Sequence, residues 1–475
     1  MSGSNGRLLV VSNRLPLTFE RNPDGSWSGQ RGSGGLVTAL LPVLEQRGGV
    51  WIGWSGVVQE EAEGLGEALW ATRLAGFDLR PVLLSASQRD LYYHGFANEI
   101  LWPLFHDLQT RCTFDPSYWQ AYREVNRRFA EEVAAVAGPH DLIWIHDYHL
   151  MGVATELAAL GVQRPTAFFL HIPFPPPDIF AKLPWSRTFL SYLLAHDLIG
   201  FQVPRDRRNF VACLRSLLPE ARAPRRSGIH VAHWQGREVR MRSFPISIDA
   251  RTLAATAARG EATAAAASIR QEMNHVFLLL GVDRLDYTKG VPFKLEAVRH
   301  LFRRHPELRR RISLLQILAP SREEIREYGR LKAEVEQLVG QINGELGEPG
   351  WMPIHYLHRS FGHDDLVAYY RAADACLATP LKDGMNLVAK EYCVARVDRD
   401  GVLILSEFAG AAHQLHQGAL LVNPYDIVAL ADRIAEAFAM PEAERRTRMM
   451  RLQRVIRGAD VFDWVDSFLA ACPAA

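Results

Sequence analysis

The chain has 475 residues, of which 48% are hydrophobic and 23% are charged, a composition typical of a globular protein with two or three domains. Its 54 lysines and arginines nearly balance its 53 aspartates and glutamates, so no overall field attracts nucleic acid or an acidic membrane. Any anionic ligand must therefore be bound by a local arrangement of residues.

Cysteine usage and hydropathy indicate the cellular setting. The five cysteines are scattered and form no CxxC pair, which is typical of reduced thiols and not of a zinc site. The first residues lack the apolar stretch of a signal peptide, and no apolar run approaches the roughly 18 residues that span a bilayer. These features predict a cytoplasmic protein whose partners are neither nucleic acid nor membrane. A homo-oligomer is compatible with the sequence, which does not determine the oligomeric state.

Strand and helix patterns alternate through the first half of the chain. Short apolar runs predict strands at 8–12, 49–54, 141–146, 166–171 and 198–202. Amphipathic patterns predict helices at 36–44, 118–136 and 151–160. The polar, glycine-rich segment 13–35 is predicted to be a loop. This alternation is typical of an α/β domain whose mostly parallel sheet carries helices on both faces.

A second alternating series follows a predicted hairpin that turns at Gln235 and Gly236. Strands are expected at 276–282, 312–318, 354–357, 373–378, 402–405 and 419–422. We therefore expect one α/β domain at 1–244, a second at 245–455, and a final helix within 456–475. The apolar face of that helix must pack on another element, and it could return to the first domain. Two tandem α/β domains are expected to leave a cleft between the carboxyl ends of their sheets.

The most informative segment is 379–391, which joins a predicted strand to a helix that begins near Gly384. Unpaired N–H groups at a helix start carry about half a positive charge and suit a diphosphate. Glu391 lies on the helix face of Leu387, where a carboxylate can accept from two vicinal hydroxyls of a ribose. The segment therefore suits a nucleotide sugar, although a capped helix over a core strand explains the same pattern.

Two cations follow the first strand of the second domain. Arg284 and Lys289 lie on the loop at the carboxyl end of that strand. Fixed cations at this place can neutralise a diphosphate as it leaves, and thus stabilise a transition state. The same loop carries Asp283 and Asp286, which could instead pair with the cations.

Other strand ends carry arginines and aromatic residues. Arg14 and Arg322 each follow a predicted strand, and their planar guanidinium groups suit phosphate, although either one alone is also typical of a surface ion pair. The glycine-rich segment 31–35 is neither a Rossmann fingerprint nor a Walker loop. Aromatic side chains at 51–54, 92–98 and 101–103 can pack on sugar faces. Core filling is expected for most of them.

Histidines and aspartates also gather at strand ends. The segment His146–His149 and the single His171 do not specify the third ligand that a zinc site requires. Asp147 and His171 better suit hydrogen bonding to hydroxyls, or proton handling near neutral pH. The Asp398-Arg-Asp400 motif precedes a predicted strand and is interpreted as a turn and not as a metal–nucleotide motif.

Eight motifs, in this order, resemble those of the retaining α,α-trehalose-6-phosphate synthases. They are Ser12-Asn-Arg-Leu-Pro16, Ser33-Gly-Gly-Leu-Val37, Leu101-Trp-Pro-Leu-Phe-His106, His146-Asp-Tyr-His149, His171-Ile-Pro-Phe-Pro175, Val282-Asp-Arg-Leu-Asp-Tyr-Thr-Lys-Gly290, Asp383-Gly-Met-Asn-Leu-Val388 and Ser406-Glu-Phe-Ala-Gly-Ala411. The resemblance runs from about Leu8 to the final helix.

The resemblance implies a GT-B fold, in which two Rossmann-like domains face each other across a cleft and the C-terminal helix returns to the first domain. It also implies transfer of glucose from a nucleotide sugar, typically UDP-glucose, to glucose 6-phosphate, with retention and without a metal or other cofactor. The product is α,α-trehalose 6-phosphate. Retention is thought to use front-face attack, in which the leaving phosphate helps take the acceptor proton, so the carboxylate pair of a retaining glycosidase is not needed.

The resemblance also implies a role for matching residues. Donor contacts are expected from Gly35, Arg284, Lys289, Asp383, Gly384, Met385, Asn386, Leu387, Val388 and Glu391. Acceptor contacts are expected from Arg14, Trp54, Tyr93, Trp102, Asp147 and Arg322. Catalytic roles are expected for Asp147, His171, Arg284 and Lys289.

Three positions depart from the family pattern. Lys382 stands where arginine is common, Ser247 replaces a frequent glycine, and Glu323 follows Arg322 where glycine is usual. The last change leaves glycerol 3-phosphate as an alternative acceptor, because relatives that use it share much of the donor half. A sugar-phosphate-binding regulator without catalysis is a second alternative, although the expected donor residues are all present. The base of the nucleotide does not follow from the sequence.

Overall fold

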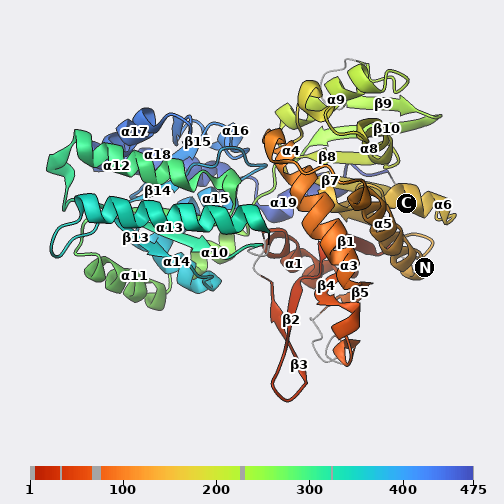
Figure 1. Ribbon diagram of the computed structural model, residues 1–475, viewed down its shortest axis with the longest axis horizontal. Helices are drawn as coiled ribbons and strands as arrows, with labels where there is room; N and C mark the ends of the chain where they lie inside the picture. The colour runs from red at the N-terminus through yellow and green to blue at the C-terminus, as the bar shows by residue number, and fades with distance from the viewer. Residues whose placement is uncertain (1–5, 33–34, 67–75, 225–229, 323–324, 474–475) are drawn as a thin grey trace. The chain divides into compact units, whose positions relative to one another are not determined.

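The computed structural model describes residues 6–32, 35–66, 76–224, 230–322 and 325–473. The chain divides into two compact units, one formed by Met1–Pro245 with Phe462–Ala475 and the other by Ile246–Val461. Each unit contains a mainly parallel sheet flanked by helices (Figure 1). The predicted α/β class with two parallel-sheet domains is therefore confirmed.

The sheet of the first unit contains all five strands that the apolar runs predict, together with the predicted hairpin. In spatial order the strands are β5 (Asp78–Leu84), β4 (Val50–Val58), β1 (Leu8–Arg14), β6 (Leu142–His146), β7 (Thr166–Leu170), β8 (Leu198–Phe201), β10 (Arg237–Ser243) and β9 (His230–Trp234). Neighbouring strands run parallel except β10 and β9, which form the hairpin.

Helices cover this sheet, and the longest of them buries one apolar stripe. The helices of the first unit are α1 (Gly35–Arg47), α3 (Ala86–Gln88), the π-helix η2 (Arg89–Leu101), α4 (Trp102–Phe105), α5 (Pro116–Val136), α6 (Val153–Ala159), α7 (Pro177–Phe180), α8 (Ser186–Leu193), α9 (Pro204–Leu217) and α19 (Val461–Leu469). In α5, Val125, Phe129 and Val133 recur at helical spacing and are fully buried. Asp115 caps this helix by accepting from Ser117 N.

The prediction of a continuous loop at 13–35 is wrong. Within it, β2 (Leu17–Arg21) and β3 (Trp27–Arg31) pair as an antiparallel hairpin. Leu17 and Phe19 point to one side and bury against Val57 and Leu65 in a small separate core. This contact is made only in the folded chain, and it outweighs the polar, glycine-rich composition from which a loop was predicted.

The C-terminal helix α19 packs on the sheet of the first unit. Trp464 and Phe468 are 4% and 0% exposed. The Phe468 ring stacks on Trp144 at a centroid distance of 4.4 Å, and Trp464 meets Phe169 edge-on at 5.1 Å. Trp464 Nε1 also donates to the carbonyl of Phe244 at 3.1 Å. The helix near the end of the chain thus completes a core whose other members, Trp144, Phe169 and Phe244, lie far earlier in the sequence.

We predict that Trp464→Ala lowers the free energy of unfolding by about 3–5 kcal/mol, because it opens a cavity and removes a buried hydrogen bond. Denaturant unfolding of the purified chain measures this change. Ser467→Ala, on the exposed face of the same helix, is the matched control and should leave stability nearly unchanged. A loss below about 1 kcal/mol for Trp464→Ala would show that α19 is dispensable for the core.

The sheet of the second unit is entirely parallel in the described residues, and it contains all the strands that the second series predicts. In spatial order the strands are β13 (Ile354–Leu357), β12 (Ile312–Ala319), β11 (Phe277–Arg284), β14 (Ala375–Ala378), β15 (Val402–Ser406) and β16 (Leu420–Val422). Their near-continuous apolar sequences fit strands that are buried on both faces.

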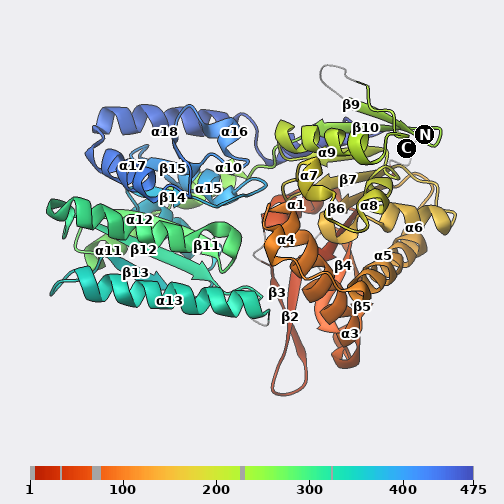
Figure 2. The ribbon, with the colours of Figure 1, turned by 45° about the horizontal axis from the view of Figure 1, so that its top comes forward.

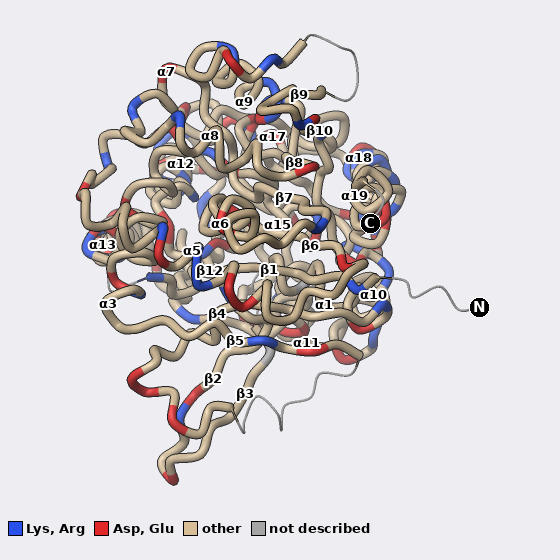
Figure 3. Tube along the Cα trace, turned by 90° about the vertical axis from the view of Figure 1, so that its right-hand side faces the viewer, with Lys and Arg blue, Asp and Glu red and all other residues tan. Residues whose placement is uncertain are grey.

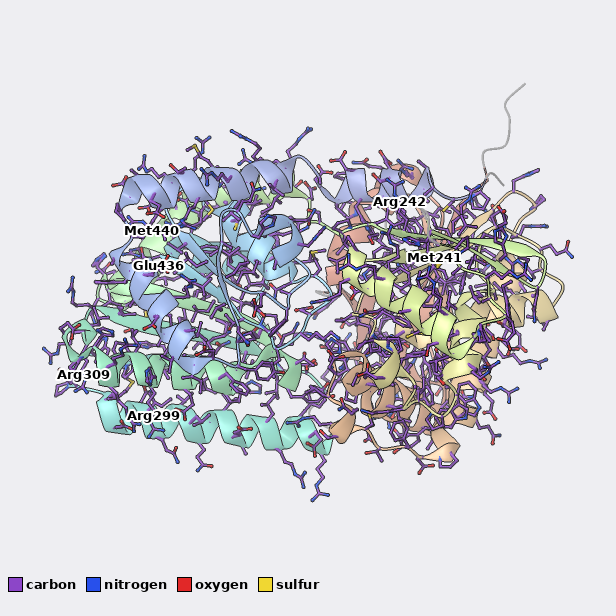
Figure 4. All side chains as sticks on the ribbon, turned by 90° about the horizontal axis from the view of Figure 1, so that it is seen from above. Met241, Arg242, Arg299, Arg309, Glu436 and Met440 are labelled. Carbon is purple, nitrogen blue, oxygen red and sulfur yellow. The ribbon has the colours of Figure 1, made fainter. Side chains whose placement is uncertain are left out.

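Two groups of helices cover the second sheet, as Figure 2 shows for α13 on one side of it and α18 on the other. The helices are α10 (Ala250–Ala257), α11 (Gly260–Glu272), α12 (Val291–Arg304), α13 (Arg326–Leu346), α14 (His363–Ala372), α15 (Leu387–Ala395), α16 (Ala412–Leu415), α17 (Ile427–Ala439) and α18 (Glu442–Arg457). Ion pairs join neighbours within a group. Arg299 of α12, labelled in Figure 4, donates to Glu345 of α13 at 2.8 Å.

A buried lysine fixes α15 within the second unit. Lys390 is 1% exposed, and its Nζ donates to the carbonyl of Ile246 at 2.7 Å and to Gln414 Oε1 at 2.8 Å. Burial lowers the pKa of Lys390 to about 7. A neutral amine can still donate both hydrogen bonds, so α15 stays attached to the first residue of its unit and to α16.

We predict that Lys390→Met changes how stability depends on pH. The pKa of Lys390 is about 7 in the folded chain, against 10.5 for an ordinary lysine side chain. The unfolded chain therefore binds more protons between these pH values. The free energy of unfolding of the parent should rise with pH relative to that of Lys390→Met, by up to about 1.4 kcal/mol per pH unit.

Urea unfolding at pH 7, 8 and 9 measures this difference. Lys182→Met replaces an exposed lysine and serves as the control for the loss of one positive charge. If the stabilities of the parent and Lys390→Met change in parallel across this range, Lys390 is not a buried, weakly basic amine.

Candidate active site

Positive and negative residues are interspersed along the described chain (Figure 3), so a site for an anion must come from local geometry.

Each sheet contains one point where the strand order reverses. In the second unit the chain proceeds from β11 through β12 to β13 on one side, and from β14 through β15 to β16 on the other. Ligands of open α/β sheets bind outside the carboxyl ends of the strands at such a point. Arg284, which the sequence placed on a loop, is the last residue of β11, and Lys289 lies in the short turn that follows it. The segment 383–391 follows β14 and runs into the first turns of α15.

The first unit has the same arrangement. The chain proceeds from β1 to β4 and β5 in one direction, and from β6 to β7 and β8 in the other. Arg14 ends β1, Asp147 directly follows β6, and His171 directly follows β7. Arg14, Asp147 and His171 therefore lie at the carboxyl ends of β1, β6 and β7, at or next to the point where the strand order reverses.

Arg284 and Arg322 lie on either side of one buried carboxylate. Asp286 is 0% exposed, and its Oδ2 lies 3.6 Å from Arg284 Nη2 and 4.0 Å from Arg322 Nη1. Burial opposes ionisation of Asp286, yet the nearby cations, Arg284 first, hold its pKa below the usual value. The sequence left open that Asp286 pairs with a cation of its loop, and this pairing is confirmed for Asp286 and Arg284. Arg284 nevertheless keeps 46% of its side chain exposed and can meet a ligand.

Asp283 does not pair with Arg284 or Lys289. Its Oδ2 lies 2.6 Å from Nζ of Lys294, and both side chains are almost completely buried. Gln316 Nε2 donates to the same oxygen at 3.1 Å. This buried pair takes Asp283 out of competition for the two cations of the loop.

Lys289 belongs to a network that includes the loop after β14. Its Nζ donates to Asp383 Oδ2 at 2.6 Å, and Asn386 Nδ2 approaches the same oxygen at 3.3 Å. Asn386 has φ 84° and caps α15 by accepting from Ala389 N at 3.0 Å. The amides of Leu387 and Val388, in the first turn of α15, have no intrahelical acceptor. One network thus holds a cation beside a helix start.

The loop before α15 passes very close to the segment after β15. A Cβ added to Gly410 would lie 1.8 Å from the carbonyl oxygen of Gly384, so only glycine fits at position 410. Ala411 N donates to the carbonyl of Met385 at 2.8 Å, and the Met385 side chain is 3% exposed. Gly384 and Met385 therefore shape the loop. Any contact they make with a nucleotide sugar is through their backbone atoms.

Glu391 lies one helical turn after Leu387, on the predicted face, but α15 begins at Leu387 and not near Gly384 as the sequence predicted. Its Oε2 accepts from the hydroxyl of Tyr370 at 2.8 Å, and burial raises its pKa. The other oxygen, Oε1, has no protein partner among the described residues. Sequence patterns gave no signal for Tyr370, which lies in α14 and reaches Glu391 only through the packing of α14 against α15.

In the first unit, Arg14 is held between aromatic rings. Its guanidinium lies 4.3 Å from the ring centroid of Trp54 and 5.8 Å from that of Tyr93. A Cβ on Gly56, whose φ is +96°, would lie 2.0 Å from Arg14 Nη1. Glycine at position 56 therefore provides the space that Arg14 occupies. Arg14 is the one exposed residue of β1.

The two tryptophans of the expected acceptor site are mostly buried. Trp54 and Trp102 are 1% and 6% exposed, so both rings fill the core, and the acceptor contact expected of them stays a prediction. Trp54 Nε1 donates to the carbonyl of Val57 at 2.8 Å, and Trp102 lies 5.8 Å from the ring of Tyr148. Tyr93 is only half-buried. The Tyr93 ring stacks on His149 at a centroid distance of 5.9 Å. Tyr93 is more accessible than either tryptophan.

Asp147 and His171 come together at the ends of neighbouring strands. Asp147 has φ 72°, and its Oδ1 accepts from His171 N at 3.2 Å. Burial lowers the pKa of His171 to about 3, which favours the predicted hydrogen-bonding role over proton handling near neutral pH. His146, which sequence reasoning did not assign to the site, lies 3.1 Å from His171. The signal for it was present in the histidine-rich end of the same motif.

The remaining predicted residues are placed as follows. Gly35 begins α1, while Ser33, Gly34 and Glu323 lie outside the described residues. Ser247 is fully buried. Lys382 is 8% exposed and lies in the loop that precedes α15.

The described residues contain no group of three or more His, Cys, Asp or Glu side chains arranged to hold a metal ion. No helix in the described parts of the chain is long and apolar enough to cross a membrane.

Known proteins resemble this chain along nearly its whole length. A trehalose-6-phosphate synthase of Mycobacterium avium is 42% identical over 475 residues, which cover 99% of this chain and 96% of that protein. The structure of a UDP-forming alpha,alpha-trehalose-phosphate synthase from Burkholderia xenovorans in complex with glucose-6-phosphate superposes with a TM-score of 0.88, at 34% identity and 98% and 99% coverage of the two chains.

A second solved structure is described as trehalose-6-phosphate from E. coli bound with UDP-2-fluoro glucose. It is 36% identical, has a TM-score of 0.87, and the match covers 98% of each chain. The family model of glycosyltransferase family 20 matches residues 6–473. With nearly its whole length matched to that model, this chain belongs to glycosyltransferase family 20.

Proposed function

We propose that the chain transfers glucose from UDP-glucose to glucose 6-phosphate with retention, and so forms α,α-trehalose 6-phosphate. The observation that carries this proposal is the pair of cations, Arg284 and Lys289, at the point where the strand order of the second sheet reverses. Relatives with solved structures support the two substrates, because one contains glucose-6-phosphate and another contains UDP-2-fluoro glucose.

The donor side of the proposal uses the second unit. Arg284 and Lys289 bind the diphosphate, which competes with Asp286 and Asp383 for them. The free amides at the start of α15 complete the anion site. The unpaired oxygen of Glu391 accepts from the ribose hydroxyls, while Tyr370 holds the other oxygen in place.

The acceptor side uses mainly the first unit. Arg14 is accessible beside Tyr93 and binds the phosphate of glucose 6-phosphate. Asp147 and His171 hydrogen bond to sugar hydroxyls. Arg322, which lies in the second unit and donates to the Tyr328 hydroxyl at 2.8 Å, adds positive charge but has only 8% of its side chain exposed.

In the proposed reaction, the bond between the anomeric carbon of glucose and the diphosphate oxygen breaks. The acceptor hydroxyl forms the new bond on the same face, and its proton passes to the leaving phosphate oxygen. Arg284 and Lys289 stabilise the charge that develops on the diphosphate. These two fixed cations supply the stabilisation that a divalent ion provides in other glycosyltransferases, so we infer turnover without added metal.

We predict that Arg284→Ala lowers kcat by roughly two to three powers of ten, because it removes one stabiliser of the departing diphosphate. Steady-state release of UDP measures the effect. Arg310→Ala, which removes a surface ion pair with Glu348, is the control and should retain kcat. Near-normal turnover of a folded Arg284→Ala chain would contradict the role given to Arg284.

The substrate proposal is tested with UDP-, GDP- and ADP-glucose, each offered with glucose 6-phosphate or glycerol 3-phosphate. We predict the largest kcat/KM for UDP-glucose with glucose 6-phosphate, and unchanged turnover in EDTA. Released nucleotide is measured, and the disaccharide phosphate is identified by mass. A larger kcat/KM with glycerol 3-phosphate would show that glycerol 3-phosphate, and not glucose 6-phosphate, is the acceptor. If no nucleotide is released while sugar phosphate still binds, the chain is a regulator and not a transferase.

A further inference from the structure

His146 and His171 form a direct contact between two imidazole rings. His146 ends β6, and His171 follows β7, the neighbouring parallel strand. Nδ1 of His146 lies 3.1 Å from Nε2 of His171. A hydrogen bond between two ring nitrogens requires a proton on one of them and a lone pair on the other. The direction of this bond decides what His171 can offer to a ligand.

Both rings are neutral near pH 7. Burial lowers the pKa of His146 well below its ordinary value, and the proximity of His171 lowers it further. Burial alone lowers the pKa of His171 to about 3. Each neutral ring carries one N–H, so two arrangements are open. Either His146 donates from Nδ1, or His171 donates from Nε2.

The surroundings of His146 Nε2 distinguish the two arrangements. This atom is buried and has no hydrogen-bond partner among the described residues. If His171 donated, the proton of His146 would sit on Nε2 as a buried donor with no acceptor. An unpaired buried N–H is rarer in folded proteins than an unpaired acceptor, and leaving one costs about 1–3 kcal/mol.

Trp144 adds to this preference. Its ring centroid lies 4.5 Å from that of His146, and its Nε1–H is buried without an acceptor in the described residues. A proton on His146 Nε2 would place a second unsatisfied donor in the same apolar environment. A bare Nε2 adds no second unsatisfied donor there.

We propose that His146 donates its Nδ1–H to Nε2 of His171 and thereby fixes His171 with its proton on Nδ1. His171 then meets a substrate hydroxyl as an N–H donor and not as a base. His146 is a positioning residue, because it acts through His171. This inference rests on the proposed function only in the role of His171 at the sugar. It also agrees with transfer of the acceptor proton to the leaving phosphate.

The tautomer is read directly by nitrogen NMR of the full chain with 15N-labelled histidine. The His171 signals are assigned as those missing from the spectrum of His171→Gln. We expect a protonated, pyrrole-type Nδ1 and a bare, pyridine-type Nε2 in His171. The opposite pattern, or a doubly protonated ring, would overturn the proposal. This result does not depend on activity, so it stands or falls separately from the proposed reaction.

Two variants of similar size, one with a hydrogen-bond donor and one without, test whether the bond from His146 to His171 affects turnover. His146→Asn supplies an amide N–H near the position of Nδ1, while His146→Leu has a similar outline and no donor. We expect His146→Leu to lower kcat about 10-fold or more, with KM for both substrates little changed, and we expect His146→Asn to restore most of kcat.

Equal kcat values for the two variants, at matched thermal stability, would show that His146 contributes packing and not a hydrogen bond. If neither variant folds, the NMR spectrum of the parent still decides the direction of the bond. A His171 tautomer as predicted in a chain that transfers no glucose would refute the proposed function and leave the assigned hydrogen bond intact.

Discussion

In both sheets the strand order reverses once. The connections that follow the two central strands leave toward opposite sides of the sheet and open a crevice at the carboxyl ends of these strands. Residues that are far apart in sequence meet at this crevice. Lys289 follows β11 and the segment 383–391 follows β14, yet Lys289 and Asp383 meet at 2.6 Å. In the first unit, Arg14 and Asp147 are brought to one edge in the same way. The chemistry of the site follows from where these strands end.

In the second unit, aspartates hold the arginine and lysine side chains in place but leave them able to bind an anion. Asp286 holds Arg284 at 3.6 Å and Arg322 at 4.0 Å, distances that leave room for a stronger ligand. Lys289 is bound more closely, at 2.6 Å. A diphosphate offers more acceptors and more charge than a single carboxylate, so it can displace these partners.

The sequence predicted the strands of the second sheet well, because fully buried parallel strands have continuous apolar runs such as 312–318. It also located the strand-end residues of both units. It failed where structure depends on distant contacts. The hairpin of β2 and β3 owes its stability to Val57 and Leu65, and Tyr370 reaches Glu391 through helix packing. Edge strand β5 carries Pro81 and alternates with exposed residues, so no apolar run marked it.

The central claim is that the reversal point of the second sheet binds the diphosphate of the donor. A crystal structure of the chain with UDP tests this claim most directly. We predict that the phosphate oxygens lie within hydrogen-bond distance of the Arg284 guanidinium and of Lys289 Nζ, with the ribose at Glu391. A nucleotide bound elsewhere, with Lys289 still paired to Asp383 and Arg284 still turned to Asp286, would contradict it.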